Sequence, residues 1–393
     1  MLFISGIPPS GGAGAPVIYR QLLRHYNPQK LDVLYCRSWD KEWRQTMGGT
    51  LLPCRHTTVG WLAPGLRWKP ARLFGHMART LNLLRLNHIM GIARKIIRDR
   101  KVEVIFTATT FCELNLAAYF LHRETGLPLY FFESDDWEEA NPTALPRYLI
   151  SKYRAEVYNS CSRLWLTSPA MVRDYASRFG VVGDFLFHFI DPHLYADHGE
   201  KIRPPGTGPI ELVYTGTINF MFLSTFRTLC RHLNSGVEVN GRSVRLTVFG
   251  AACPQEFIGP AVRFGGLISP DSIPEVIAGA HASLIAVTFD QDPAMMQLVK
   301  TSLYTKTVDY LAVGRPVLVV APDYTAEVDY FGGVTHVVPS VEREAFAGAL
   351  RRLVQDTSYA NALAAAGQEF VRQRHGPQAL EQVFLRHFRK ESA

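Results

Sequence analysis

Lys306 and Asp309 are the residues of this chain whose types and spacing point most directly to ligand chemistry. They lie in the segment 298–320, where Thr301 or Ser302 is expected to cap a helix that ends at a glycine and leads into an apolar strand. Steps of four and three residues place Ser302, Lys306 and Asp309 on one face of that helix. The helix start and the Lys306 ammonium would bind a diphosphate, and the Asp309 carboxylate would meet ribose hydroxyls. The pattern therefore predicts a nucleotide-sugar site.

This segment resembles the donor-site signature of GT-B fold glycosyltransferases, in the group 1 branch of the glycogen-phosphorylase-like superfamily. Many members read Lys-x-x-Glu-Tyr-x-Ala-x-Gly-x-Pro-Val where this chain has residues 306–317, with Asp309 in place of Glu. The resemblance extends to bacterial exopolysaccharide and glycolipid glycosyltransferases, and it implies an α/β fold of two Rossmann-like domains facing a cleft. A core helix before a strand is the alternative; it explains Val308 and Leu311 but not the Lys306 and Asp309 pair.

Retaining members of the family often carry a Glu-x7-Glu pair whose second glutamate corresponds to Asp309. The matching first position here is Thr301, so the pair is broken. Retention and inversion of the sugar stereochemistry both stay open. Isolated histidines such as His188 belong to no motif, and we expect them to be packed or exposed rather than catalytic.

Glycine-rich turns follow several of the expected strands. The first turn, residues 10–14, includes Gly12 and lacks the Gly-x-Gly-x-x-Gly spacing of dinucleotide-binding proteins, so it predicts a ligand-lining loop without a dinucleotide cofactor. In the second half, Gly216 and Thr217 match the family's Tyr-x-Gly turn, and Gly250 ends a strand that lies beside the base pocket in relatives. The resemblance implies that these residues face the donor.

Asp135 and Asp136 stand at the end of an apolar run, residues 129–132, which predicts a buried strand. Ligands collect at the carboxyl ends of strands in open parallel sheets. In a sugar transfer a carboxylate must take the proton of the attacking hydroxyl, and partial burial shifts its pKa toward that task. A similar Ser-Asp pair in bacterial glucuronosyltransferases favours Asp135 as the base, and a merely solvated acidic loop is the alternative.

A basic segment, residues 55–101, contains eleven Lys or Arg residues and one acid, Asp99. Aromatic rings are interleaved with these cations, as at headgroup level in membrane-bound proteins. The sequence predicts a surface for an anionic membrane and a lipid-linked acceptor, although a single-stranded nucleic-acid patch or a plain exposed loop fits the same composition. The expected membrane and acceptor residues are Trp61, Arg67, Trp68, Lys69 and Arg72.

The overall composition sets broad limits. The length of 393 residues fits two domains, and the formal net charge of +7 indicates an anionic partner without identifying it. Six scattered cysteines form neither a zinc motif nor an evident disulfide framework. No signal peptide or membrane-spanning run is recognised, so we expect a cytoplasmic protein, bound peripherally to the inner face of the membrane.

Alternation of apolar runs with helical stretches predicts a parallel sheet covered on both faces in each half. The expected divisions are an acceptor-side domain at 1–199, a Pro/Gly-rich linker at 200–208, a donor-binding domain at 209–374 and a last helix at 375–393. Strands are expected at 2–5, 31–36, 102–106, 129–132, 163–166, 185–189, 210–214, 246–249, 262–264, 282–287 and 316–320. By the resemblance, the last helix packs back on the first domain.

The resulting hypothesis is a glycosyltransferase of hexosyltransferase type that moves a sugar from a nucleotide-diphosphate sugar to a lipid-linked or other saccharide acceptor. Lys306 would neutralise charge on the departing diphosphate, so we expect neither a metal nor another cofactor. No nucleic-acid partner is expected. The alternatives are a nucleotide-sugar epimerase of the same architecture and a non-catalytic binding scaffold.

Overall fold

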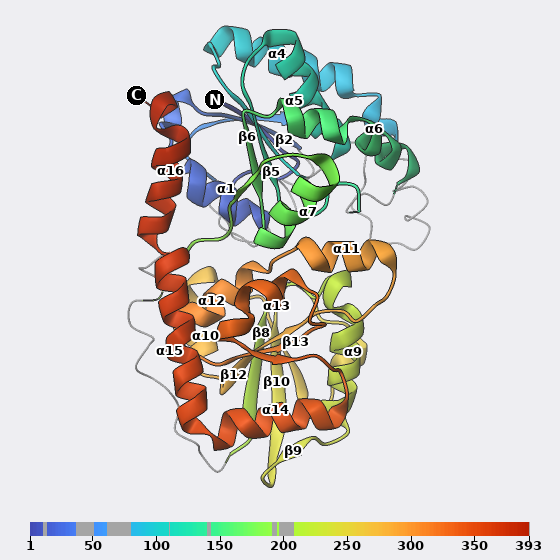
Figure 1. Ribbon diagram of the computed structural model, residues 1–393, viewed down its shortest axis with the longest axis vertical. Coiled ribbons are helices and arrows are strands. Elements are labelled where there is room, and N and C mark those ends of the chain that lie inside the picture. Colours follow the sequence, from blue (N-terminus) through green and yellow to red (C-terminus); the bar gives the residue numbers. More distant parts are fainter. Residues whose placement is uncertain are drawn as a thin grey trace. The chain divides into compact units, whose positions relative to one another are not determined.

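The computed structural model describes residues 1–10, 14–36, 51–60, 80–109, 111–139, 143–190, 195 and 208–392 (Figure 1). The chain forms two compact units. The first comprises Met1–Phe187 together with Phe384–Ala393, and the second comprises His188–Val383. No helix within the described residues is both long and apolar enough to cross a membrane.

The first unit is built on a parallel sheet in the order β3-β2-β1-β4-β5-β6-β7. Its inner strands are short apolar runs that are buried along their whole length, as expected for a sheet covered on both faces. The strands are β1 (Leu2–Ile4), β2 (Asp32–Cys36), β3 (Arg55–Val59), β4 (Ile105–Ala108), β5 (Leu129–Glu133), β6 (Arg163–Leu166) and β7 (Asp184–Phe185). The helices are α1 (Ala15–Leu23), α4 (Leu86–Arg100), α5 (Cys112–Thr125), α6 (Ala144–Ser160) and α7 (Pro169–Phe179).

The end of the last helix, α16 (Pro377–Ser392), completes the core of this first unit. Phe388 is fully buried. Its ring stacks on Trp165 with 5.5 Å between centroids and meets the edge of Tyr130 at 5.9 Å. A buried aromatic side chain is a large hydrophobic contribution, so these last residues are part of the fold of the first unit.

The second unit contains a sheet in the order β11-β10-β8-β12-β13-β14, parallel throughout, with the short strand β9 antiparallel to β10. The strands are β8 (Ile210–Thr215), β9 (Glu238–Val239), β10 (Arg242–Phe249), β11 (Val262–Gly266), β12 (Ala282–Ala286), β13 (Val317–Val320) and β14 (His336–Val338). The helices are α9 (Phe220–Asn234), α10 (Ile273–Ala278), α11 (Pro293–Thr301), α12 (Thr305–Val313), α13 (Ala326–Phe331), α14 (Arg343–Gln355) and α15 (Thr357–Arg374).

Both sheets are doubly wound, and this confirms the predicted fold class of two Rossmann-like α/β units. In each sheet the first strand lies inside, and the strand order runs outward from it in both directions: the switch lies between β1 and β4 in the first unit and between β8 and β12 in the second. Ligands of such sheets bind beside the carboxyl ends of the strands at the switch. The turn after β8 is therefore the place to look for the donor site.

Most strands lie where the sequence predicts them. Three strands were not predicted: the polar β3, which begins at Arg55, and the short strands β9 and β14, which begin at Glu238 and His336. The unit boundary at 187/188 precedes the expected linker, and within that linker only residue 208 is described.

Candidate functional site

The turns after β8 and β10 each contribute a glycine, Gly216 and Gly250, and the two glycines are in close contact. Gly216 has φ 124°, a backbone conformation that favours glycine, and its N–H donates to the carbonyl of Phe249 at 2.8 Å. A Cβ on Gly250 would lie 2.5 Å from the Gly216 carbonyl oxygen, and a Cβ on Gly216 would lie 3.1 Å from Cε of Lys306. The absence of side chains at these two positions therefore lets the turns after β8 and β10 and the Lys306 side chain share one small space.

Lys306 lies half-buried in a cage of three aromatic rings. Its Nζ is 4.5 Å from the ring centroid of Phe222, 5.2 Å from that of Tyr214 and 5.6 Å from that of Tyr304. Within the described residues no carboxylate lies within ion-pair distance of this ammonium. Desolvation lowers the pKa of Lys306 to about 8, against the fields of Glu327 and Asp309, which raise it. A cation held among rings without an acid partner is suited to bind an anion.

The predicted helix start is wrong by several residues. Thr301 is the last residue of α11, and its Oγ1 donates to the carbonyl of Gln297 at 2.9 Å, so it caps nothing in α12. Ser302 is the buried residue that follows α11, and it does not share a helix face with Lys306. The physical reason is that Asp292 followed by Pro293 is an earlier helix-start signal. It begins α11, and this helix continues through Thr301.

Helix α12 begins instead at Thr305, with Tyr304 as its N-cap. The Tyr304 side chain makes no capping hydrogen bond. Among the described residues, no acceptor is present for the backbone N–H groups of Thr305 and Lys306, so both donors of the first turn are available beside the Lys306 ammonium. Helix N-termini with available N–H groups favour anions, particularly phosphates.

Asp309 lies one turn further along α12 and is partly engaged. Its Oδ1 accepts hydrogen bonds from Nε2 of His188, at 3.1 Å, and from the hydroxyl of Tyr195. Neither partner was predicted to be functional. Within the described residues no hydrogen bond reaches Oδ2. The predicted donor residues that come together are Gly216, Lys306 and Asp309, beside the first turn of α12. The adjoining turns contain Thr217, which is exposed, and Gly250.

A second acid close to Lys306 was not predicted. Glu327, in the first turn of α13, is fully buried, and its carboxylate contacts the start of α12 through Thr307 and Tyr304. In the sequence it appears only as one acid among others in a short helical stretch, so no local signal distinguishes it. The aromatic rings around Lys306 come from β8, α9 and the residue before α12, and no spacing rule brings them together either.

In the first unit the two predicted acids have different surroundings. The Asp136 carboxylate is fully buried and ion-paired, with Oδ1 3.1 Å from Arg154 Nη1 and Oδ2 3.1 Å from Arg178 Nη1. Asp135 is half-buried at the carboxyl end of β5. Burial raises the pKa of Tyr19 in α1, and the charge of Asp135 raises it further. Asp136 is therefore engaged in buried ion pairs, and Asp135 is the more accessible of the two acids.

The remaining predicted residues lie outside the described part of the chain: Gly12, Trp61, Arg67, Trp68, Lys69 and Arg72.

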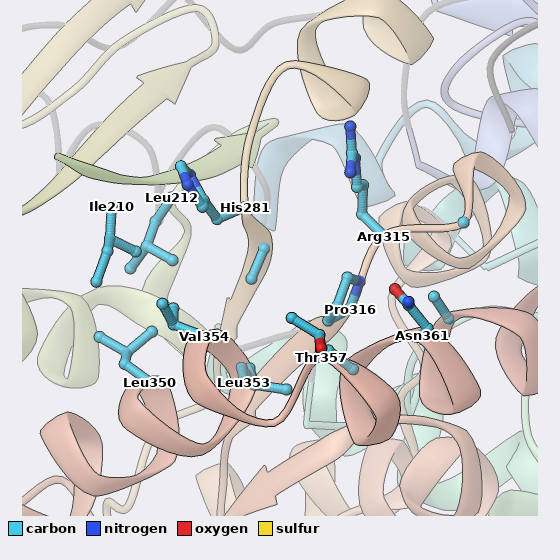
Figure 2. A pocket seen from close by; sticks show the side chains of 14 residues that line it. Ile210, Leu212, His281, Arg315, Pro316, Leu350, Leu353, Val354, Thr357 and Asn361 are labelled. Atoms are coloured by element: carbon cyan, nitrogen blue, oxygen red, sulfur yellow. The ribbon is translucent and has the colours of Figure 1, made fainter. Parts of the chain in front are cut away.

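A separate cavity of about 240 Å³ lies at the opposite, amino-terminal edge of the second sheet (Figure 2). Its wall is formed by the first residues of β8 and β12, by Pro316 before β13, and by apolar side chains of α14 and α15. None of the predicted donor residues lines it. The cavity and the donor residues are thus distinct features of the second unit.

Comparisons with known proteins agree with this arrangement. Residues 226–385 match a family model described as glycosyl transferase-like. No curated protein sequence matches. The structure resembles the sucrose-phosphate synthase of Thermosynechococcus elongatus, with 14% identity, 99% of this chain and 98% of that chain covered, and a TM-score of 0.70. It also resembles Anabaena HepE, solved in complex with UDP-glucose, with 11% identity, 99% of both chains covered and a TM-score of 0.68.

A glycosyltransferase from Rickettsia africae shares the fold as well, with 11% identity, 99% and 98% of the two chains covered and a TM-score of 0.65. At these identities the neighbours show the fold alone. The shared fold confirms the predicted GT-B architecture, and the family match over residues 226–385 supports the predicted class of protein, a glycosyltransferase enzyme.

Proposed function

We propose that this enzyme transfers a hexose from a nucleotide-diphosphate sugar to a lipid-linked saccharide in the assembly of a bacterial surface polysaccharide or glycolipid. The observation that carries the donor part is the half-buried Lys306 ammonium, which has three rings and the start of α12 as neighbours. The complex of the structural neighbour HepE with UDP-glucose supports the same donor class.

In the proposed reaction an acceptor hydroxyl oxygen forms a bond to the anomeric carbon as the bond from that carbon to the diphosphate oxygen breaks. The electron pair leaves with the diphosphate, and Asp135 takes the hydroxyl proton. Lys306 and the N–H groups of Thr305 and Lys306 stabilise the charge that develops on the leaving group. We propose that these groups supply the positive charge without a metal or other cofactor.

The acceptor part is supported by the composition of the segment 55–101 and by its described end. Helix α4 exposes Lys95 and Arg98, and Leu84, just before that helix, is 79% exposed. Exposed apolar side chains and exposed cations in one segment are the combination by which proteins bind anionic membrane surfaces. The proposal includes peripheral attachment to the cytoplasmic face of the membrane, and no nucleic-acid partner.

The donor part is tested by titrating UDP into the wild type and into Lys306→Ala by calorimetry. We expect at least tenfold weaker binding in the variant, equivalent to about 1.4 kcal/mol. Lys300→Ala is the matched control, because Lys300 also lies over an aromatic ring, Tyr324 at 5.5 Å, but is exposed on α11. Equal affinities in all three proteins would contradict the donor site.

The reaction itself is tested by incubating a panel of nucleotide sugars with and without membrane extract. Sugar transfer that requires the extract supports a lipid-linked acceptor. Conversion of one nucleotide sugar into another without extract would indicate an epimerase. Binding without turnover under either condition would indicate a scaffold.

A further inference from the structure

Helix α12 has no side-chain cap of its own, and Glu327 of the neighbouring helix α13 takes the place of one. Its Oε1 accepts a hydrogen bond from the Thr307 hydroxyl, with 2.5 Å between the oxygens. Its Oε2 accepts a hydrogen bond from the backbone N–H of Tyr304 at 3.4 Å. Tyr304 is the N-cap residue, and Thr307 lies in the first turn. The carboxylate thus bonds both before and inside the helix start, which fixes the first turn between two points.

The cost of burying this carboxylate indicates that its position matters. A fully buried acid without compensation is strongly destabilising. Burial raises the pKa of Glu327 to about 7, while the Thr307 and Tyr304 hydrogen bonds and the charge of Lys306 lower it. The relation is reciprocal, because the Glu327 charge favours the protonated form of Lys306. One acid therefore supports both the backbone and the cation of the site.

The bonds that Glu327 makes leave the ligand-facing donors available. It engages the N–H of Tyr304 and the hydroxyl of Thr307, whereas the N–H groups of Thr305 and Lys306 have no acceptor among the described residues. A cap supplied by the Tyr304 position itself would occupy N–H groups of the first turn, as capping side chains usually do. Capping from α13 avoids that competition.

We infer that Glu327 is a positioning residue that holds the first turn of α12 and the Lys306 ammonium in place for the diphosphate of the donor. The inference rests on the proposed donor site. It does not give Glu327 a contact with substrate, since both of its oxygens bond within the protein.

The test compares the affinities of UDP and of uridine, measured by calorimetry or by competition, in a set of variants. Glu327→Ala should weaken UDP at least tenfold and leave uridine within about twofold, because only the diphosphate contacts depend on the first turn. Glu327→Gln should stay within about threefold of wild type for UDP, since its amide oxygen accepts from Tyr304 and its amide NH2 donates to the Thr307 hydroxyl.

Two further variants keep the test decisive if Glu327→Ala fails to fold. Thr307→Val removes one of the two bonds at nearly constant volume and should weaken UDP selectively, whereas Thr307→Ser should restore it. Asp329→Asn, an exposed acid of the same helix, is the control and should match wild type. If the wild type binds no UDP, the proposed function is contradicted. If the wild type binds UDP and the variants Thr307→Val and Glu327→Ala bind it equally well, the inference alone is overturned. The same holds if these variants lose affinity for UDP and for uridine to the same extent.

Discussion

Nε2 of His188 lies 3.1 Å from Oδ1 of Asp309, although 121 positions separate the two residues. His188 is also the first residue of the second unit, and its carbonyl accepts from Nδ1 of His375 at 2.7 Å. Burial lowers the pKa of His375 to about 4, so this histidine stays neutral and holds the His188 backbone at physiological pH. The pairing fixes one oxygen of the Asp309 carboxylate in a defined place on α12. A carboxylate held in this way is suited to accept hydrogen bonds from a pair of ribose hydroxyls.

Asp309→Asn should therefore weaken UDP about tenfold while leaving inorganic pyrophosphate unchanged. The amide keeps the size of the side chain, but its NH2 group cannot accept from a hydroxyl. Calorimetric titrations of the two ligands check this prediction. Equal losses for UDP and pyrophosphate would place Asp309 at the diphosphate or in a purely structural role.

Binding of the donor should weaken as the pH rises through about 8. Lys306 loses its proton there because burial lowers its pKa from the usual value near 10.5. The ammonium is fully present below this range and is lost above it, so UDP affinity should fall between pH 7 and 9.5. Lys306→Met, a neutral side chain of similar length, should bind weakly and show no decline in that range. A wild-type affinity that is flat from pH 7 to 9.5 would show that the Lys306 charge is not used.

The two adjacent acids of the first unit should respond differently to the same substitution. Asp135→Asn should reduce turnover by about 10² or more with UDP affinity nearly unchanged, as for loss of a general base. Asp136→Asn should instead destabilise the protein by about 1–3 kcal/mol, because Arg154 and Arg178 lose their fully buried partner and keep Glu138 and Asp174 as ion-pair partners. Steady-state kinetics and urea unfolding of both variants decide between these roles. The reverse pattern would identify Asp136 as the base.

Glu133 should make the stability of the first unit fall as the pH rises from 4.5 to 8. Burial raises the pKa of this acid to about 8, with the charge of Asp136 acting in the same direction, so the folded protein keeps a proton that the unfolded chain loses near 4.5. The free energy of unfolding should decrease across that range by up to about 1.4 kcal/mol per pH unit. Glu133→Gln should remove this component, and Glu156→Gln, at an exposed acid of α6, should retain it. Unfolding by urea at pH 5, 6.5 and 8 measures the slopes; identical slopes in wild type and Glu133→Gln would contradict a protonated Glu133.

The membrane surface predicted for the segment 55–101 should bind vesicles according to their charge. We expect sedimentation with vesicles containing anionic phospholipid, weaker sedimentation with neutral ones, and release by salt, since exposed charges are screened beyond about 8–10 Å. Replacing Arg67, Lys69 and Arg72 together by Ser should reduce binding without unfolding the protein. Sedimentation that ignores lipid charge, or equally tight binding to single-stranded nucleic acid, would refute this surface.

The sequence was sufficient for the fold because the strands of both sheets are continuous apolar runs between turn residues. A fully apolar run such as Val317–Val320 is stable only when it is buried, and the residues that flank it in the chain form the turns. The short β14 escaped prediction because three residues that include His336 carry too little apolar character to stand out.

The sequence predicted only those residues of the site that lie close to one another in the chain. Lys306 and Asp309 lie three residues apart on one helix, so their spacing carries the signal. The start of α12 was misplaced because Thr301 and Ser302 have good capping chemistry, but α11 already occupies them. Glu327 and His188 were missed because they reach the site through tertiary packing, from helices and turns that the sequence does not bring near Lys306 or Asp309.

The position of Phe388 within the first unit has a consequence for biosynthesis. The ring that stacks on Trp165 belongs to residues synthesised after the whole second unit. During translation the rings of Trp165 and Tyr130 therefore lack their Phe388 partner until the second unit has been synthesised. The first unit therefore begins to be synthesised before the second unit but can complete its core only after it. We expect a nascent chain stalled before residue 384 to expose the apolar surface around Trp165 and Tyr130.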